Sequence, residues 1–459
     1  MVTIFENSVN RRSRAKKKKS ENSSSYFMFL LTGLYVFIIG VFIKILHYIR
    51  TCRSTEKPLV QVLVLGDIGH SPRMQYHALS LANSGRFMVE LVGYRGSDPL
   101  ESILMHPSIS LRYLRQFASP FPIPFILYGI SKVFFDTVQL LLIFLTRTSQ
   151  CVLIQTPPAV PSIILSLFTG VVLDFHNITY MHLSSKLDES KFVNRQIVCM
   201  VRMYETFLSK FAHSSFCVTT SMREFLITEF KLSNVTTLYD RPGPQFYVSE
   251  KKSKLELSDA FFQMAWIGSS PQRPALSEYK HIMVSATSWT EDEYFPIMLE
   301  ALPVLDLKLE KTLLLITGKG SGRLGFENEF RKINLKNIDL VTGWVTASDY
   351  PYFLKCADLG ISFHSSTSGL DLPMKLVDML GANLPVVAYD FFALKELSAC
   401  SYRFRNAAEL SEHLLDLTVN SGAIARRKSA QKMALEWRES DWNSEWKKIA
   451  WPIFSQFSK

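Results

Sequence analysis

The tract with the clearest chemistry covers residues 368–389 and reads SGLDLPMKLVDMLGANLPVVAY. Pro373 suits the first turn of a helix, where its missing N–H is not needed. Gly381 suits the end of that helix, and an apolar segment follows it. We therefore expect a helix over residues 373–380 that leads into a buried strand.

The polar residues of this tract suit a nucleotide-sugar. Asp371, Lys375 and Asp378 share one face if the helical path extends back to Asp371. Lys375 and the helix N-terminal amides suit a diphosphate, and Asp378 could accept hydrogen bonds from a ribose diol. With Gly369 and Leu370 in the preceding turn, these residues form the expected donor site. The alternative is an amphipathic helix with a solvated ion pair.

Two other segments place polar groups after apolar strands. Residues 313–320 (LLLITGKG) put Lys319 between two glycines, which would let backbone approach a phosphate. Residues 284–290 (VSATSWT) are rich in hydroxyls, which at the carboxyl end of a strand can hold phosphate or ribose oxygens. We assign Lys319 and Ser288 to the donor site. No D-x-D motif occurs in the sequence, and we expect no tightly bound metal.

The N-terminal half contains candidates for the acceptor. Residues 66–73 (GDIGHSPR) follow a strand where a doubly wound sheet binds ligands. There Gly69, Ser71 and Arg73 are the expected acceptor contacts, and Arg73 could hold phosphates bidentately.

A strand end in the same half offers candidate catalytic groups. Residues 173–180 (LDFHNITY) place Asp174 and His176 there. His176 is a candidate base, with Asp174 as an alternative base or an orienting group, and a structural role for the histidine remains open. The acidic residues at 291–293 are expected to begin a helix in solvent.

Apolar strands alternate with helical stretches through two halves of the chain, which predicts an α/β fold with two doubly wound, Rossmann-like domains and a cleft between them. The expected domains are residues 59–245 and 246–425, followed by helices over 426–459. Strands are expected at residues 59–66, 88–93, 151–155, 171–175, 216–219, 234–239, 281–287, 313–318, 340–342, 359–362 and 384–389.

The N-terminus predicts membrane attachment. Residues 1–25 are basic, Ser-rich and expected to be disordered, and residues 26–46 form a transmembrane anchor with an uncharged run at 26–43. The net charge of +10 includes seven basic residues at 11–19, so the rest of the chain carries about +3. With no base-reading motif, this distribution argues against nucleic-acid binding.

The apolar segment at 121–146 could be a second span, but Lys132 and Asp136 interrupt it. We expect a helix that lies against the bilayer or is buried in the first domain. The six scattered cysteines show no metal spacing and favour a reducing compartment.

Three stretches resemble the chitobiosyldiphosphodolichol beta-mannosyltransferases of N-glycan assembly: residues 62–82, 285–302 and 364–387, the last with GLDLPMK followed by VDM. The resemblance covers residues 59–440 and implies a GT-B fold. It also implies transfer of the first mannose from GDP-mannose, in inverting β1,4 linkage, to dolichyl-diphosphate-linked chitobiose. In more distant relatives the acid matching Asp378 contacts the nucleotide ribose. His70 stands where the family more commonly has Arg.

The resemblance also implies a single-pass protein of the endoplasmic reticulum membrane with its catalytic domains in the cytosol. The basic cluster ahead of the anchor instead places the body in the lumen by the positive-inside rule. We follow the family and expect no glycan at the sequons of Asn22, Asn177 and Asn234. Other dolichol-pathway mannosyltransferases are possible partners.

Two other functions remain open from the sequence. One is an inactive family member that serves as a scaffold in a membrane glycosyltransferase complex, although the retained Lys375 and Asp378 argue against it. The other is a related GT-B transferase that uses another nucleotide-sugar, such as a UDP-sugar.

Overall fold

The computed structural model describes residues 57–119, 121–147, 149–247, 264–268, 274–289, 293, 295–346 and 348–458. The predicted tail at 1–25 and the predicted anchor at 26–46 lie outside these ranges, as do residues 291 and 292.

The first domain is built on a seven-stranded sheet in the order β3-β2-β1-β4-β5-β6-β7, and all neighbouring strands are parallel. Such a sheet is covered on both faces, so its central strands are apolar almost throughout. The strands are β1 Leu59–Asp67, β2 Met88–Tyr94, β3 Ile109–Leu114, β4 Cys151–Thr156, β5 Gly170–Phe175, β6 Ser214–Cys217 and β7 Val235–Thr237.

The second domain has a sheet of the same size in the order β14-β13-β12-β9-β10-β11-β8. Only β8 is antiparallel to its neighbour among the described strands. The strands are β8 Ala265–Ile267, β9 His281–Ala286, β10 Thr312–Thr317, β11 Ile338–Gly343, β12 Leu359–Ser362, β13 Val386–Tyr389 and β14 Tyr402–Phe404.

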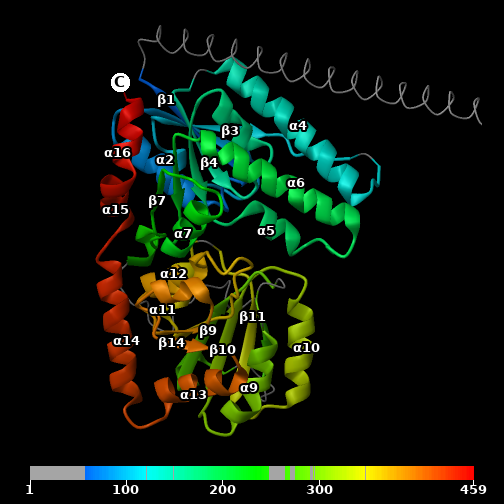
Figure 1. The fold of residues 1–459 in the computed structure, drawn as a ribbon. Coiled ribbons are helices and arrows are strands. Elements are labelled where there is room, and N and C mark those ends of the chain that lie inside the picture. Colours follow the sequence, from blue (N-terminus) through cyan, green and yellow to red (C-terminus); the bar gives the residue numbers. More distant parts are fainter. Residues whose placement is uncertain are drawn as a thin grey trace, which may run out of the picture.

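Helices connect the strands and cover both sheets (Figure 1). In the first domain they are α2 Pro72–Asn83, α3 Glu101–Leu104, α4 Phe125–Thr146, η1 Ser162–Leu167, α5 Thr179–Ser184, α6 Phe192–Leu208, η2 Ser209–Phe211, α7 Thr220–Thr228 and η3 Pro244–Tyr247. The rest are η4 Leu276–Glu278, α9 Pro296–Asp306, α10 Arg323–Ile333, α11 Tyr350–Lys355, α12 Met374–Gly381, η5 Phe392–Glu396, α13 Ala407–Thr418, α14 Ala423–Arg438, α15 Trp442–Ile449, α16 Trp451–Phe454 and η6 Ser455–Phe457.

The two parallel sheets confirm the predicted fold class, and all the predicted strands are present within a few residues of their expected bounds. The prediction missed β3, β8 and β14. All three lie at sheet edges, where a strand is short or half-exposed and lacks the continuous apolar run of a central strand.

Helix α4 has one buried face and one exposed face. Leu140 and Phe144 pack into the core of the first domain, while Ile130 and Phe134 are exposed. The portion 127–146 is long and apolar enough to cross a membrane by length and composition alone. Its two charges are paired internally, since Lys132 donates to Asp136 and both contact the hydroxyl of Tyr94. The helix is thus attached sideways to the domain.

The C-terminal helices return to the first domain. Helix α14 runs along the second domain. The helices that come next, α15 and α16, lie beside α2 (Figure 1). Trp442, Trp446 and Phe454 are buried in the same apolar cluster as Met74 and Leu81 of α2. The last segment of the chain therefore completes the core of the first domain.

The carboxyl edges of the two sheets face each other. Thr219, which follows β6, donates from its hydroxyl to the carbonyl of Leu370, which follows β12. Glu396 of the second domain accepts from the backbone N–H groups of Thr220 and Ser221, at 2.7 and 2.6 Å. This arrangement brings the candidate residues of both domains to one interface.

Candidate functional site

Lys375 lies at the carboxyl edge of the second sheet, in the first turn of α12. Its Nζ donates to Glu293 Oε1 at 2.6 Å and to Ser288 Oγ at 2.9 Å. The side chain remains partly exposed. The structure thus brings together two predicted donor residues, Lys375 and Ser288, and adds a carboxylate.

Glu293 was expected in solvent, and that expectation is wrong because its side chain is nearly buried. Its Oε2 accepts from the backbone N–H groups of Ser288 and Trp289 and from the hydroxyl of Thr287. The backbone of Glu293 also bridges to His364. Nothing local distinguishes Glu293 from the two acids before it, so only the tertiary structure identifies it.

Asp371 organises the loop that precedes α12. Its carboxylate accepts from the hydroxyls of Ser366 and Ser368, and His364 Nε2 lies 3.6 Å away. Burial would raise the pKa of Asp371, but the contacts with His364 and Ser366 hold it below the ordinary value. Since α12 begins at Met374, the helical path does not extend back to Asp371, and the condition for a face shared with Lys375 is not met.

Gly369 and Leu370 belong to the same loop. Gly369 has a φ of +69°, which confirms the predicted turn, because this left-handed conformation favours glycine. The side chain of Leu370 is buried against the core of the first domain. Leu370 therefore links the domains and does not present its side chain to a ligand.

Lys319 extends the candidate site along the sheet edge. A Cβ at Gly318 would lie 1.9 Å from the carbonyl oxygen of Thr287, and one at Gly320 would lie 2.2 Å from that of Ser288. These two glycines are therefore required for close packing against the loop after β9. Lys319 itself is exposed, with its Nζ 4.5 Å from the ring centroid of Trp344. Trp344, which the prediction did not name, is 45% exposed just after β11.

Asp378 faces the first domain. Its charge interacts with Asp240 and with the hydroxyl of Tyr350. At the end of the same helix, a Cβ at Gly381 would lie 2.4 Å from Pro242. Burial and the charge of Asp240 raise the pKa of Asp378 to about 8.

The loop after β1 is held by its own contacts. The N–H of Gly69 donates to Asp67 Oδ1 at 3.0 Å, and Ser71 Oγ donates to the carbonyl of Asp67 at 3.0 Å. His70 is exposed, and its Nδ1 lies 2.6 Å from Asp67 Oδ2. Among these residues, His70 presents the most accessible polar side chain.

Arg73 does not fulfil its predicted role. Its guanidinium is buried and binds Asp174 bidentately at 2.8 and 2.9 Å. It also donates to Asp240 Oδ1 and to the carbonyl of Leu238, each at 2.9 Å. The prediction that Arg73 holds acceptor phosphates is wrong, because these carboxylates satisfy it in the interior. Breaking such a buried pair typically costs about 3–5 kcal/mol.

Asp174 and His176 form a pair at the end of β5. His176 Nε2 lies 2.9 Å from Asp174 Oδ2, and the imidazole is 24% exposed while the carboxylate is fully buried. Burial would raise the pKa of Asp174, but Arg73 and His176 hold it well below the ordinary value. Asp174 is thus ionised, buried and a weak base, so it is better suited to orient the imidazole than to take up a proton itself.

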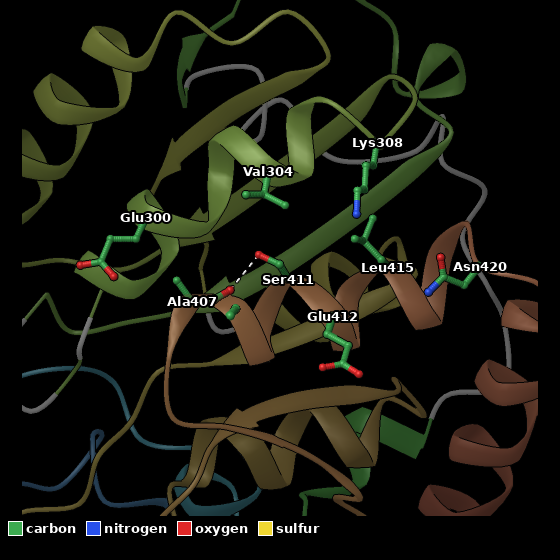
Figure 2. A pocket seen from close by; sticks show the side chains of 9 residues that line it. Glu300, Val304, Lys308, Ala407, Ser411, Glu412, Leu415 and Asn420 are labelled. Atoms are coloured by element: carbon green, nitrogen blue, oxygen red, sulfur yellow. Dashed lines mark hydrogen bonds between the residues drawn. The ribbon is translucent and has the colours of Figure 1, made fainter.

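A separate surface hollow lies between α9 and α13 (Figure 2). Its volume is about 410 Å³, and Glu300, Lys308 and Glu412 are among its lining residues. It contains none of the predicted site residues. Within the described ranges, no three His, Cys, Asp or Glu side chains converge as metal ligands would.

The fold resembles that of known sugar transferases. The crystal structure of WaaG, a glycosyltransferase involved in lipopolysaccharide biosynthesis, aligns with a TM-score of 0.57 at 14% identity, over 86% of this chain and 99% of that chain. The two facing Rossmann-like domains therefore have the GT-B fold.

Comparison with curated sequences gives the family. The chitobiosyldiphosphodolichol beta-mannosyltransferase of Yarrowia lipolytica is 34% identical over an alignment of 442 positions that covers 91% of this chain and 92% of that protein. The UDP-glycosyltransferase TURAN of Arabidopsis thaliana is 33% identical, over 86% of this chain and 97% of that protein. A scan against models of protein families finds no match. The chain belongs to the chitobiosyldiphosphodolichol beta-mannosyltransferase family, as its sequence motifs predicted.

The raised pKa of Asp378 predicts a pH-dependent stability. The native state keeps a proton that the unfolded chain releases above about pH 4, so this contribution is full below pH 4 and is lost as the pH rises toward 8. From pH 5 to pH 8, Asp378→Asn should therefore gain stability relative to the wild type by at least about 1 kcal/mol.

Urea unfolding at the two pH values measures this difference. Asp98→Asn is the control, because Asp98 is exposed and its replacement should give the same difference at both pH values. Parallel pH profiles for the wild type and Asp378→Asn would contradict the assignment.

Proposed function

We propose that the protein transfers the first mannose from GDP-mannose to dolichyl-diphosphate-linked chitobiose, in β1,4 linkage and with inversion. The observation that carries the proposal is the family membership together with polar groups from both domains at one interface. The donor occupies the edge of the second domain, and the acceptor occupies the edge of the first.

The donor diphosphate fits the positive end of this edge. Lys375 is partly exposed, lies in the first turn of α12 and is aimed by Glu293. The ammonium and the helix amides together stabilise the negative charge that develops on the departing GDP. These groups supply positive charge without a bound metal, which is the arrangement we propose.

The nucleoside fits the rest of the edge. The exposed indole of Trp344, with Lys319 over it, offers a flat surface on which a base can stack. Asp378 is the proposed partner of the ribose hydroxyls, which would favour its charged form.

His176 is the proposed base for the acceptor hydroxyl. Ionised Asp174 can only accept a hydrogen bond, so it selects the tautomer of His176 with the proton on Nε2. Nδ1 then has a free lone pair that can take the proton of the attacking hydroxyl. The hydroxyl oxygen attacks the anomeric carbon as the bond to GDP breaks, which inverts the configuration.

The acceptor lipid fits an exposed apolar face of the first domain, formed by α4 and α6, which belong to the same side of its sheet (Figure 1). Its exposed side chains are Leu127, Ile130, Phe134, Leu142, Leu145, Phe192, Met200, Met203 and Phe207. We propose that this face lies on the cytosolic surface of the endoplasmic reticulum membrane, with the N-terminal anchor as a single span.

The proposed function is tested with labelled GDP-mannose and a chitobiosyl-diphospho-lipid. Mannose transfer in β linkage is expected, and excess unlabelled GDP should suppress it while UDP should not. Lys375→Met should weaken GDP binding at least tenfold, because it removes a charge-assisted contact. Lys332→Met, at an exposed lysine of α10, is the control. Transfer from a UDP-sugar would favour the related transferase, and neither transfer nor GDP binding would favour a scaffold.

The role of His176 is tested against a second histidine–aspartate pair at the same sheet edge. His176→Ala should lower kcat at least 100-fold and leave GDP binding unchanged, since general base catalysis contributes about 10²–10⁴. His70→Ala is the matched comparison, because His70 also contacts an aspartate but is more exposed. A larger loss in His70→Ala, or near-normal turnover in His176→Ala, would sink the assignment.

The membrane face is tested by charge insertion. Phe134→Glu with Met203→Glu should reduce transfer to a bilayer-embedded acceptor at least tenfold while sparing a short-chain soluble acceptor. Leu307→Glu with Ile424→Glu, at exposed sites of the second domain, is the control and should change neither rate. Equal losses with both acceptors would contradict the proposal.

The cytosolic orientation is tested at Asn234, which lies in an exposed sequon. A shift in electrophoretic mobility that endoglycosidase removes, and that Asn234→Gln abolishes, would contradict the cytosolic orientation.

A further inference from the structure

The C-terminal helix α15 reaches the proposed base through a continuous chain of polar contacts. Trp446 Nε1 donates to His77 Nδ1 at 2.9 Å. His77 Nε2 lies 3.3 Å from Asp174 Oδ2, which is also 2.9 Å from His176 Nε2. This series of contacts therefore links Trp446 to His176 through His77 of α2 and Asp174 at the end of β5.

The chemistry of each member fixes its proton. An indole N–H can only donate, so His77 Nδ1 must accept and the proton of His77 lies on Nε2. That N–H lies 3.3 Å from Asp174 Oδ2, an electrostatic contact that falls outside hydrogen-bond geometry, and the paired Arg73 keeps this carboxylate ionised. The opposite tautomer would direct a lone pair of His77 at the carboxylate, which is repulsive. The hydrogen bond from Trp446 thus determines that Asp174 lies beside an N–H of His77 and not beside a lone pair.

His77 has no access to solvent that could replace these contacts. Its side chain is fully buried, and burial lowers its pKa, which favours the neutral imidazole. The ring centroid of Trp442 lies 5.0 Å from that of His77, with the two rings nearly perpendicular. The ring centroid of Phe216 lies 5.8 Å from that of His77. In this aromatic enclosure the polar groups near the ring nitrogens are Trp446 Nε1 and the carboxylate of Asp174.

The donor end of the chain is held rigidly. Trp446 stacks on Phe454 with 11° between the ring planes, and Asp441 caps α15 by accepting from the N–H of Ser444. On α2, Arg73 and His77 are four residues apart, so both reach Asp174 from one helical face. The carboxylate is therefore fixed from two directions, by a charged partner and by a neutral one.

We propose that Trp446 and His77 are positioning residues that hold Asp174, and through it His176, in the orientation that proton transfer requires. This inference rests on the proposed role of His176 as the base. It gives the C-terminal helices a part in the reaction in addition to their part in the core.

The test uses Trp446→Phe in the full-length chain. This change keeps an aromatic ring in the core and removes only the N–H donor. It should lower kcat for mannose transfer by about tenfold, as loss of an orienting partner does in metal sites. The KM values for GDP-mannose and for the lipid acceptor should change less than about twofold, since the side chain of Trp446 is buried in the core of the first domain.

Trp442→Phe is the matched control. Trp442 lies on the same helix with similar burial, and its indole donates to Ser80 Oγ, outside the chain. It should lose a comparable amount of thermal stability but keep kcat within about twofold. Equal kcat losses in both variants would mean that the indoles act only through stability, which would overturn the proposal.

His77 supplies a second, independent measurement. His77→Gln can still accept from Trp446 and donate to Asp174, so it should retain kcat within about threefold. His77→Leu can do neither and should lose at least tenfold. Equal activity of the two variants would overturn the proposal, whatever their stability.

A double variant separates this inference from the proposed function. If Trp446 acts through His176, then Trp446→Phe should cause no further loss in a His176→Ala background. An additive loss would overturn the positioning role while leaving the base intact. Near-normal turnover in His176→Ala alone would instead overturn the proposed base.

Discussion

The buried charge of Asp174 is the constraint on which the first domain's site depends. Burying an ionised carboxylate here carries a desolvation penalty. This penalty is offset by Arg73, which binds the carboxylate bidentately, and by two histidines near the same oxygen. Arg73 in turn holds Asp240, at the start of the connection to the second domain. One cluster of charges thus sets the orientation of the proposed base and ties together β5, α2 and the connection between the domains.

The second domain shows the same principle. Lys375 is the exposed cation, and the nearly buried Glu293 aims it while bracing the loop after β9 through two backbone N–H groups. In each domain a buried carboxylate orients a partly exposed side chain that bears nitrogen, His176 in the first domain and Lys375 in the second. Thr219 and Glu396, which cross between the domains, bring these two arrangements to a common interface.

The sequence predicted the fold well because central parallel strands are apolar throughout, and it missed β3, β8 and β14 because edge strands are not. It also located helix α12 and the turn before it, since Gly369, Pro373 and Gly381 mark a turn and both helix ends. It failed where a role depends on burial. Arg73 follows a ligand-binding loop and resembles a phosphate contact, yet its partners are 101 and 167 residues away. Glu293 and His77 acquire their contacts only in the folded chain, so no local pattern identifies them.

The central claim is that ionised Asp174 selects the tautomer of His176, and histidine tautomers can be observed directly. A long-range ¹H–¹⁵N correlation spectrum of histidine-labelled protein at pH 8, where a free imidazole is neutral, distinguishes a proton on Nε2 from one on Nδ1. His176→Ala and His77→Gln assign the two signals. The structure predicts the Nε2–H tautomer for both residues. A proton on Nδ1 of His176 would leave no lone pair for the acceptor hydroxyl and would contradict the account.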